Sequence, residues 1–381
     1  MLLSAVSMPA ASHATLGART ILAAAFACAA GLAMNLWMAA NNRDGFDVDF
    51  NQFYAASRLA GSGLLYDWDS VRTLEAEHAP TVRNSRLPVV AFAEKLVCNL
   101  PYASAQAVWL AGSLVSILVF ALAWPGLNRL LAAVALCWSM PVALGLVLGQ
   151  DTPFWLLGAA AGFLWLSRGR PRLAGAAFSL CVCKYHLAVG FPILLAAQKR
   201  WKALAAAAAA GAVLLGASFW VEGLGWPRRY WVAINHPEFS PAAPRMANLR
   251  ALAWWLPWPG AVEILLAIPV AYLLWSFCRR TPCLGLAAAG AAAAGTVLGH
   301  HGHAHDFALL IPLLVFTVQR PEVPIWLKSW AILLLTPVPT LLLVGGKPFL
   351  GQLLVIGFIL TALLWECLVK TSAGAPPPVP A

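Results

Sequence analysis

Long apolar stretches alternate with short polar segments along the whole chain. The stretches of about bilayer-spanning length lie near 20–40, 104–123, 128–148, 152–167, 203–221, 257–277, 283–299, 325–344 and 349–369. Shorter apolar stretches lie at 173–183, 187–197 and 307–318. Because backbone in lipid must satisfy its hydrogen bonds within the chain, these stretches predict helices. The pattern therefore predicts an all-α, polytopic membrane protein with about 11–12 membrane-embedded helical segments.

The composition supports the same class of protein. The chain is 61% hydrophobic and 10% charged, whereas soluble domains are about a quarter charged. The net charge of +10 is of a size also found in nucleic-acid-binding proteins. However, the basic residues lie in short loops between apolar stretches, which is the pattern of membrane topology. We expect no nucleic-acid partner.

The pattern leaves no segment long enough for a separate soluble domain. We expect a cytoplasmic tail at 1–19, a transmembrane domain at 20–370 and a disordered, proline-rich cytoplasmic tail at 371–381. Within the transmembrane domain the longest polar segments are an outer loop at 41–103 and a second outer loop at 222–256. The stretch 20–40 resembles a signal peptide, but it is long enough to span the bilayer.

Basic residues predict the orientation. The short loops that carry Arg168, Arg170 and Arg172, then Lys199–Lys202, then Arg279 and Arg280 belong in the cytoplasm by the positive-inside rule. The long polar loops then face outward. We therefore expect a multi-pass protein of the inner (plasma) membrane whose active site lies on the periplasmic, extracytoplasmic face.

One segment does not fit a topology in which each apolar stretch crosses the membrane once. Only about 25 apolar residues separate the basic loop at 168–172 from the basic loop at 199–202. Two half-helices that break near Lys184 would keep both loops inside and would bring Lys184 to the outer surface. The alternative is one long tilted helix in which Lys184 snorkels or pairs. A charged residue at this depth is a candidate functional residue.

The first outer loop holds the candidate bases. Asp44, Asp47 and Asp49 follow the first span, and Phe50, Phe53, Tyr54 and Leu64 then follow a roughly helical period. This spacing predicts an amphipathic helix at the membrane interface. Asp49 lies where that helix begins, so its role could be that of an N-cap. Its role could also be catalytic.

Other polar groups gather in the remaining outer segments. The second outer loop has Arg245, Asn248 and Arg250 among aromatic residues, and the run 300–306 reads His-His-Gly-His-Ala-His-Asp. Imidazoles near a carboxylate can bind zinc, but no second set of ligands has a recognisable spacing. We favour a polar cluster that binds an anionic substrate.

These features resemble the GT-C membrane glycosyltransferases, and most closely the family that includes the actinobacterial phosphatidylinositol-mannoside mannosyltransferases. The matching residues are, in order, Asp49-Phe50-x-x-Phe53-Tyr54-x-Ala56, Gly63-Leu64-Leu65-Tyr66-Asp67, Gly149-Gln150, the loop 168–172 leading into Leu173-Ala174-Gly175 and Lys184, and His305-Asp306-Phe307. Two positions depart from the pattern. Lys184 is followed by Tyr185 instead of proline, and Asn248-Leu249-Arg250 replaces Asn-x-Ser.

The resemblance implies transfer of a sugar, often mannose, from a polyprenyl-phosphate donor to the hydroxyl of a lipid or glycan acceptor on the outer face. An acceptor hydroxyl needs a base, for which we choose Asp49 first and Asp47 second. Fixed cations must hold the departing phosphate, and we expect Lys184, Arg245, Arg250 and His305 to do so. We expect further substrate contacts from Tyr54, Gln150, His186, Asn248, His303 and Asp306.

This scheme predicts an inverting transferase that needs no cofactor and no divalent metal. Its partners would be the polyprenyl-phosphate-linked sugar donor, the lipid or glycan acceptor and the membrane lipids. The alternative is a transporter or a flippase for lipid-linked sugars, because broken helices and intramembrane charge also serve transport. The sequence shows no inverted repeat, and its carboxylates lie in an outer loop. Both features favour the transferase.

Overall fold

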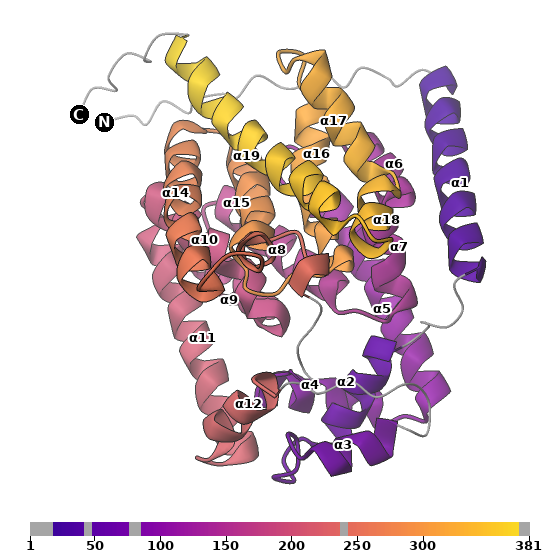
Figure 1. Cartoon of the computed structure of the whole chain (residues 1–381), viewed down its shortest axis with the longest axis vertical. Helices are drawn as coiled ribbons and strands as arrows, with labels where there is room; N and C mark the ends of the chain where they lie inside the picture. Colours follow the sequence, from indigo (N-terminus) through magenta and orange to yellow (C-terminus); the bar gives the residue numbers. More distant parts are fainter. Residues whose placement is uncertain (1–17, 42–47, 76–84, 237–242, 373–381) are drawn as a thin grey trace.

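The computed structural model describes residues 18–41, 48–75, 85–236 and 243–372, and these residues form helices without strands. Figure 1 shows a bundle of helices with a smaller group of short helices below it. The expected all-α, polytopic membrane architecture is confirmed.

The bundle contains helices of several lengths. Five segments are long and apolar enough to cross a membrane: α5 (Tyr102–Ala123), the stretch Pro171–Ala197, α11 (Trp201–Glu222), α14 (Pro259–Arg280) and the part Pro348–Val369 of α19 (Pro348–Ser372). Two bent pairs reach this length together: α6 (Arg129–Trp138) with α7 (Met140–Val147), and α17 (Ile325–Leu335) with α18 (Val338–Val344). The protein is therefore a multi-pass membrane protein.

Shorter apolar helices complete the bundle in the described part of the chain. They are the part Thr20–Asn35 of α1 (Ala18–Asn41), α8 (Thr152–Ser167), α15 (Leu284–Leu298), and the 3-10 helix η5 (Ala304–Leu310) that continues into α16 (Ile311–Gln319). Nearly every residue of α15 is buried. This helix consists mostly of alanine and glycine, so its neighbours can approach its backbone closely.

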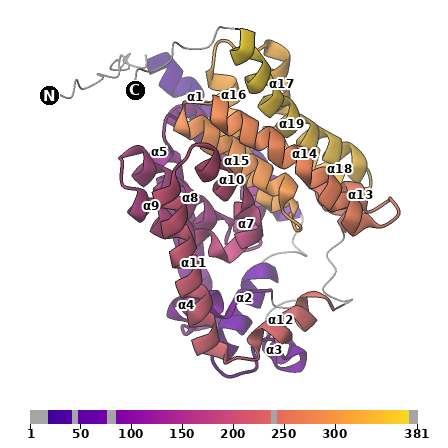
Figure 2. The same cartoon turned by 90° about the vertical axis from the view of Figure 1, so that its left-hand side faces the viewer.

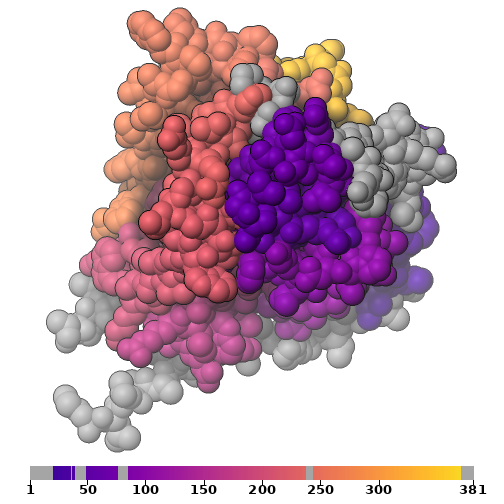
Figure 3. Space-filling view, turned by 90° about the horizontal axis from the view of Figure 1, so that it is seen from below, coloured from indigo at the N-terminus to yellow at the C-terminus, as the bar shows by residue number. Residues whose placement is uncertain are grey.

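Short helices from both outer loops form a cap at one end of the bundle. They are α2 (Val48–Leu59), α3 (Trp68–Glu75), α4 (Pro88–Cys98) and α12 (Trp226–Ile234), seen at the bottom of Figures 1 and 2. Seen from below, the indigo α2 and α3 lie beside the red α12 (Figure 3). The backbone N–H of Gly61 donates to Glu222 Oε1 at 2.7 Å, which ties the two loops together. Interfacial helices in the first outer loop were predicted.

The segment that contains Lys184 is folded back on itself. It comprises α9 (Pro171–Phe178), the 3-10 helix η2 (Ser179–Val189) and α10 (Gly190–Ala197), and Lys184 has non-helical backbone angles (φ −132°, ψ 60°). Its length alone would allow a single span. However, Gly175 packs so closely on the first turns of α11 that a Cβ there would lie 2.5 Å from the Cβ of Ala206.

This packing favours the hairpin over the long tilted helix. Helix α11 begins four positions after α10 ends, and α9 packs on those first turns of α11, so the chain reverses between α9 and α10. Gly190 and Gly295 allow the hairpin to pack on α15, because a Cβ on either would lie about 2 Å from a backbone carbonyl oxygen of the other segment. The consequence is that Lys184 lies near the tip of the hairpin.

Candidate active site

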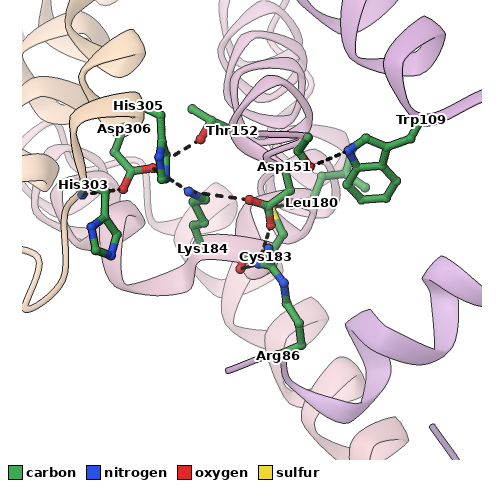
Figure 4. Close-up of polar contacts among 11 residues, drawn as sticks. Arg86, Trp109, Asp151, Thr152, Leu180, Cys183, Lys184, His303, His305 and Asp306 are labelled. Carbon is green, nitrogen blue, oxygen red and sulfur yellow. Dashed lines mark hydrogen bonds and ion pairs between the residues drawn. The ribbon is translucent and has the colours of Figure 1, made fainter. Parts of the chain in front are cut away.

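A chain of buried ion pairs lies where the cap meets the bundle (Figure 4). Lys184 Nζ lies 2.6 Å from Asp306 Oδ1 and 3.6 Å from Asp151 Oδ1. The guanidinium of Arg86 donates a short hydrogen bond to the other oxygen of Asp151. The four side chains are at most 7% exposed. Two cations therefore balance two carboxylates, which compensates the cost of burying each charge.

Arg86 is held from several sides. It also donates to the carbonyl oxygen of Cys183 at 2.8 Å, and its guanidinium lies 3.8 Å from the ring centroid of Phe53. Its own carbonyl accepts a hydrogen bond of 2.6 Å from the hydroxyl of Tyr66. Tyr66 belongs to the Gly-Leu-Leu-Tyr-Asp motif of the first outer loop. That motif therefore anchors the ion-pair chain through Arg86.

Glu94 of α4 is a second carboxylate near Arg86, and unlike Asp151 it forms no ion pair within the described part of the chain. It is 9% exposed, and its Oε2 has no hydrogen-bond partner among the described residues. Burial raises the pKa of Glu94 to about 8, although the charge of Arg86 opposes the rise. Glu94 is therefore protonated at neutral pH.

The Gly149-Gln150 turn brings Asp49 to the edge of the ion-pair chain. Gly149 has a φ of +69°, and a Cβ on it would lie 2.4 Å from the Cβ of Phe50. Only glycine fits this close approach. The N–H of Phe50 donates to the carbonyl of Leu148 at 3.1 Å, which docks the first turn of α2 on the turn.

Asp49 is itself partly buried, in the first turn of α2. Burial raises the pKa of its carboxyl above the usual range. A hydrogen bond from the side chain of Gln150 and the charges of Lys184 and Arg86 act against this rise. The carboxylate therefore lies within electrostatic reach of both buried cations without a close ion pair to either.

The histidine run encloses the other end of the ion-pair chain. The side chain of His303 accepts a hydrogen bond from the backbone N–H of Asp306, whose carboxylate accepts one from the N–H of His303 at 2.9 Å. This reciprocal capping box fixes the start of η5. His305 is buried, and its Nε2 lies 3.5 Å from Asp306 Oδ1. Thr152 donates to the same oxygen at 3.2 Å.

The second outer loop supports the histidine run. Asn248 is fully buried, accepts from the N–H of Ala251 and donates to the carbonyl of Gly299 at 2.9 Å. A guanidinium nitrogen of Arg250 lies 3.2 Å from His301 Nδ1. The ring centroids of His301 and His186 are 6.1 Å apart. Asn248 thus positions the loop before His300.

The structure places the predicted site residues in several parts of the molecule. Those around the ion-pair chain are Asp49, Gln150, Lys184, His303, His305 and Asp306. Arg250, His186 and Asn248 surround the histidine run beside it, and Arg245 is exposed on the surface. Tyr54 is turned into the cap, where its hydroxyl bonds the Leu100 carbonyl and accepts from Arg58. Asp47 lies outside the described residues.

Sequence reasoning missed Arg86, Asp151 and Glu94 as site residues. Asp151 follows Gly149-Gln150 directly, so the turn itself was a usable signal. Arg86 and Glu94 carried none, because single charged residues are common in a polar loop. Among the described residues, no group of three or more His, Cys, Asp or Glu side chains is arranged to hold a metal ion.

Together, the helical bundle, the cap of short helices and the buried charges at their junction define a membrane protein with a polar site between cap and bundle. The chain belongs to glycosyltransferase family 87, because the model of that family matches residues 88–299, more than half of its 381 residues. No curated protein and no solved structure matches the chain.

The family assignment settles the coarse activity. Family 87 is a membrane glycosyltransferase family of the GT-C type, so the protein is a transferase that uses a sugar donor and an acceptor in the membrane. The matched residues include Gln150, Lys184 and Asn248. Asp49 precedes the match, and His303 follows it.

Proposed function

We propose that the protein transfers a sugar, mannose in the first instance, from a polyprenyl-phosphate donor to an acceptor hydroxyl on the outer face, with inversion and with Asp49 as the base. The observation that carries this proposal is the position of Asp49. It is a partly exposed carboxylate beside buried cations, at the junction of the interfacial cap and the bundle. The choice of mannose and of a polyprenyl-phosphate donor comes from the resemblance to the phosphatidylinositol-mannoside mannosyltransferases.

Asp49 suits the role of base. An acceptor hydroxyl becomes a competent nucleophile only when a group within hydrogen-bond reach takes its proton. A pKa raised by burial makes the Asp49 carboxylate a stronger base than a carboxylate in water. The side chain of Gln150 opposes part of this rise in the pKa, so it stabilises the deprotonated form of Asp49.

Lys184 suits the role of a phosphate ligand, although it already has carboxylate partners. A lysine ammonium has three N–H donors. Asp306 takes one at 2.6 Å, whereas Asp151 at 3.6 Å is beyond hydrogen-bond distance. A donor phosphate can therefore accept a hydrogen bond from Lys184 while the Asp306 pair persists. His305 lies next to this pair.

Arg250 and Arg245 lie closer to the protein surface than Lys184, so we assign them to the outer part of the donor. Arg250 is half-buried beside His301, and Arg245 is exposed. We assign them to attracting the anionic donor and holding the outer part of its head group. One displacement assisted by one base inverts the anomeric centre, because the acceptor attacks the face opposite the departing phosphate.

The predicted sidedness also belongs to this proposal. It places Ala304 on the extracytoplasmic side and Gly169 in the cytoplasm. In a variant without native cysteines, a cysteine at 304 should react with an impermeant thiol reagent in intact cells, and a cysteine at 169 should not. Labelling at 169 would reverse the orientation and place the site in the cytoplasm.

The decisive experiment is sugar transfer by the purified protein in lipid nanodiscs. Polyprenyl-phosphate mannose, polyprenyl-phosphate glucose and the corresponding nucleotide sugars, each radiolabelled in the sugar, are supplied with total membrane lipids as acceptors. We expect label to pass from a polyprenyl-phosphate donor to a lipid or glycan. Transfer only from a nucleotide sugar, or from neither kind of donor, would refute the proposal.

A further inference from the structure

Three basic segments lie at the end of the bundle opposite the cap. They are the stretches 168–172 and 198–202 and the last two residues of α14, Arg279 and Arg280. Together they carry six arginines, two lysines and no acidic residue. All eight charged side chains are exposed, and in the described part of the chain none of them forms an ion pair. The three segments therefore present uncompensated positive charge.

Helix α11 sets the distance between these segments and the cap (Figure 1). It begins at Trp201 and ends at Glu222, whose carboxylate accepts the hydrogen bond from Gly61 in the cap. Its 22 residues have a length of roughly 33 Å, which is close to the thickness of the hydrocarbon core of a bilayer. The basic segments therefore lie at the membrane surface opposite the cap.

Tertiary contacts make the three segments neighbours. The side-chain amide of Gln198 donates to the carbonyls of Cys278 at 3.3 Å and Thr281 at 3.2 Å, which joins the second segment to the end of α14. Gly175, one turn after Arg172, packs on the first turns of α11, which joins the first segment to the second. The positive-inside rule explains why the segments share one side of the membrane, but it does not require them to touch. Together they form the basic patch.

Two arginines of the basic patch are held beside one aromatic ring. The guanidinium carbons of Arg168 and Arg170 lie 5.6 Å and 5.3 Å from the ring centroid of Trp165. A cation is attracted to the face of an aromatic ring, so both charges are kept near each other. Because like charges repel, this arrangement is most stable when an anion binds to both.

The backbone of Lys199 supports a use for charge at this position. Lys199 has a φ of +55°, in the left-handed region, at the turn that ends α10. The turn that ends α8 has the same backbone hydrogen bonds, and its equivalent residue is Gly169 with a φ of +69°. Glycine is favoured there because a Cβ is strained in this conformation. Lysine is therefore the less stable choice for the fold, and it adds a cation to the basic patch.

Apolar surface borders the basic patch on the membrane side. Trp201 is 57% exposed and Leu173 is 45% exposed, and few side chains of α11 are buried. A free phosphate makes no use of such a surface, whereas the hydrocarbon chains of a lipid do. Eight cations on three segments also exceed what a single phosphate can neutralise. Basic pockets between membrane helices suit the head group of cardiolipin, which has two phosphates.

We propose that the basic patch binds a cardiolipin-type lipid. Its two phosphates contact the cations of the three segments, and its hydrocarbon chains lie along α9 and α11 beside Leu173 and Trp201. The proposal depends neither on the sugar nor on the role of Asp49, because the basic patch and the candidate active site lie at opposite ends of α11.

The test is lipid binding by the purified full chain in detergent, followed by native mass spectrometry and by melting curves. The probes are tetraoleoyl cardiolipin, dioleoyl phosphatidylglycerol, dioleoyl phosphatidylcholine and inorganic pyrophosphate. We expect cardiolipin to bind and to raise the melting temperature at concentrations about tenfold lower than phosphatidylglycerol. Phosphatidylcholine should have no effect, and pyrophosphate at the same concentration should not displace cardiolipin.

A matched pair of double variants localises the lipid. Arg170→Gln with Arg200→Gln removes two charges of the basic patch and should weaken cardiolipin binding about twentyfold, since each cation at a membrane surface contributes about fivefold in affinity. Arg129→Gln with Arg228→Gln removes two exposed arginines outside the basic patch and should leave binding unchanged. If the first double variant does not fold, as judged by its melting curve, Arg200→Gln alone should weaken binding about fivefold.

Lys199→Gly separates lipid binding from stability. Glycine relieves the strained turn, so the lipid-free variant should melt at the same temperature as the parent or higher. The lost cation should nevertheless weaken cardiolipin binding about fivefold. A residue with a purely structural role would not give these opposite changes.

Several outcomes would overturn the proposal. Equal binding of phosphatidylglycerol and cardiolipin would show general attraction to anionic lipid, and displacement by pyrophosphate would identify a site for a free anion. An equal loss of affinity in the control double variant would show an effect of net charge alone. Unchanged affinity in Lys199→Gly and in the double variant of the basic patch would place the lipid elsewhere.

Discussion

Two groups of carboxylates at the same end of the bundle have opposite surroundings. Asp151 and Asp306 are buried and paired with Arg86 and Lys184. Asp49 is partly exposed, and the neutral side chain of Gln150 is among the groups that stabilise its charged form. The residue type is the same in all three cases. Only the number of close cations and the access to solvent differ.

This difference separates structural charge from reactive charge. A carboxylate that balances a buried cation cannot take up a proton without leaving that cation uncompensated, which costs several kcal/mol. A carboxylate with one neutral hydrogen bond can accept a proton at much smaller cost. The ion-pair chain is therefore suited to hold the hairpin and η5 together, and Asp49 is suited to catalysis.

The largest expected effect tests the structural half of this comparison. Lys184→Ala removes the cation between Asp151 and Asp306, so we expect a loss of about 3–5 kcal/mol in the free energy of unfolding. The double variant Lys184→Met with Asp306→Leu removes one charge of each sign and should recover much of that loss. Reversible unfolding in mixed micelles measures both. A single variant as stable as the parent would show that the pair is not structural.

The next largest effect tests the reactive half. The structure places Asp49 inside the first turn of α2 rather than at its N-cap. If its only role is to favour that helix terminus, Asp49→Asn should cost at most about 1 kcal/mol of stability and leave transfer nearly normal. If Asp49 takes the acceptor proton, turnover at saturating donor should fall on the order of a hundredfold or more, with an unchanged melting temperature and donor affinity. Near-normal transfer would remove Asp49 from the catalytic role, and Asp47 would then be tested in the same way.

The pH dependence of activity sharpens the same point. A base works only when it is deprotonated. Because burial raises the pKa of Asp49, turnover should fall on acidification at a higher pH than the ionisation of a carboxylate in water would give. The measurement is turnover from pH 4 to pH 8 at saturating donor. A profile that is flat down to the usual range of an aspartate would contradict the raised pKa.

The smallest expected effect is a pH dependence of stability that comes from Glu94. Glu94 lies in the cap and, unlike Asp151, has no hydrogen bond from a cation within the described residues. The folded state holds its proton up to a pKa of about 8, whereas the unfolded chain releases it at its ordinary, lower pKa. Stability should therefore fall with rising pH between these values, by at most about 1.4 kcal/mol per pH unit, and should level off above the folded pKa.

Glu94→Gln should remove this decline, because glutamine keeps the shape of the side chain but does not titrate. Melting temperatures of the parent and the variant at pH 5.5, 7 and 8.5 make the comparison. Parallel curves for the two proteins would show that Glu94 does not titrate in this window.

Several features could be predicted from the sequence because each depends on a short segment. The apolar stretches predicted the helices, the spacing of Phe50, Phe53 and Tyr54 predicted α2, and the basic loops on both sides of Lys184 predicted a hairpin. The structure brings Asp49, Gln150, Lys184, His303, His305 and Asp306 close to one another, and their choice as site residues stays a prediction. Their chemical roles stay predictions.

The tertiary structure alone decided which charges are paired. Arg86 and Asp151 are 65 positions apart, and Lys184 and Asp306 are 122 positions apart. Hydropathy and helix periodicity act over one or a few turns, so they determine which segments enter the membrane. Ion pairing depends on contacts between distant segments. The sequence therefore determined that this is a membrane protein of many helices, and the packing of the hairpin, cap and η5 decided which carboxylates are neutralised and which one stays partly exposed.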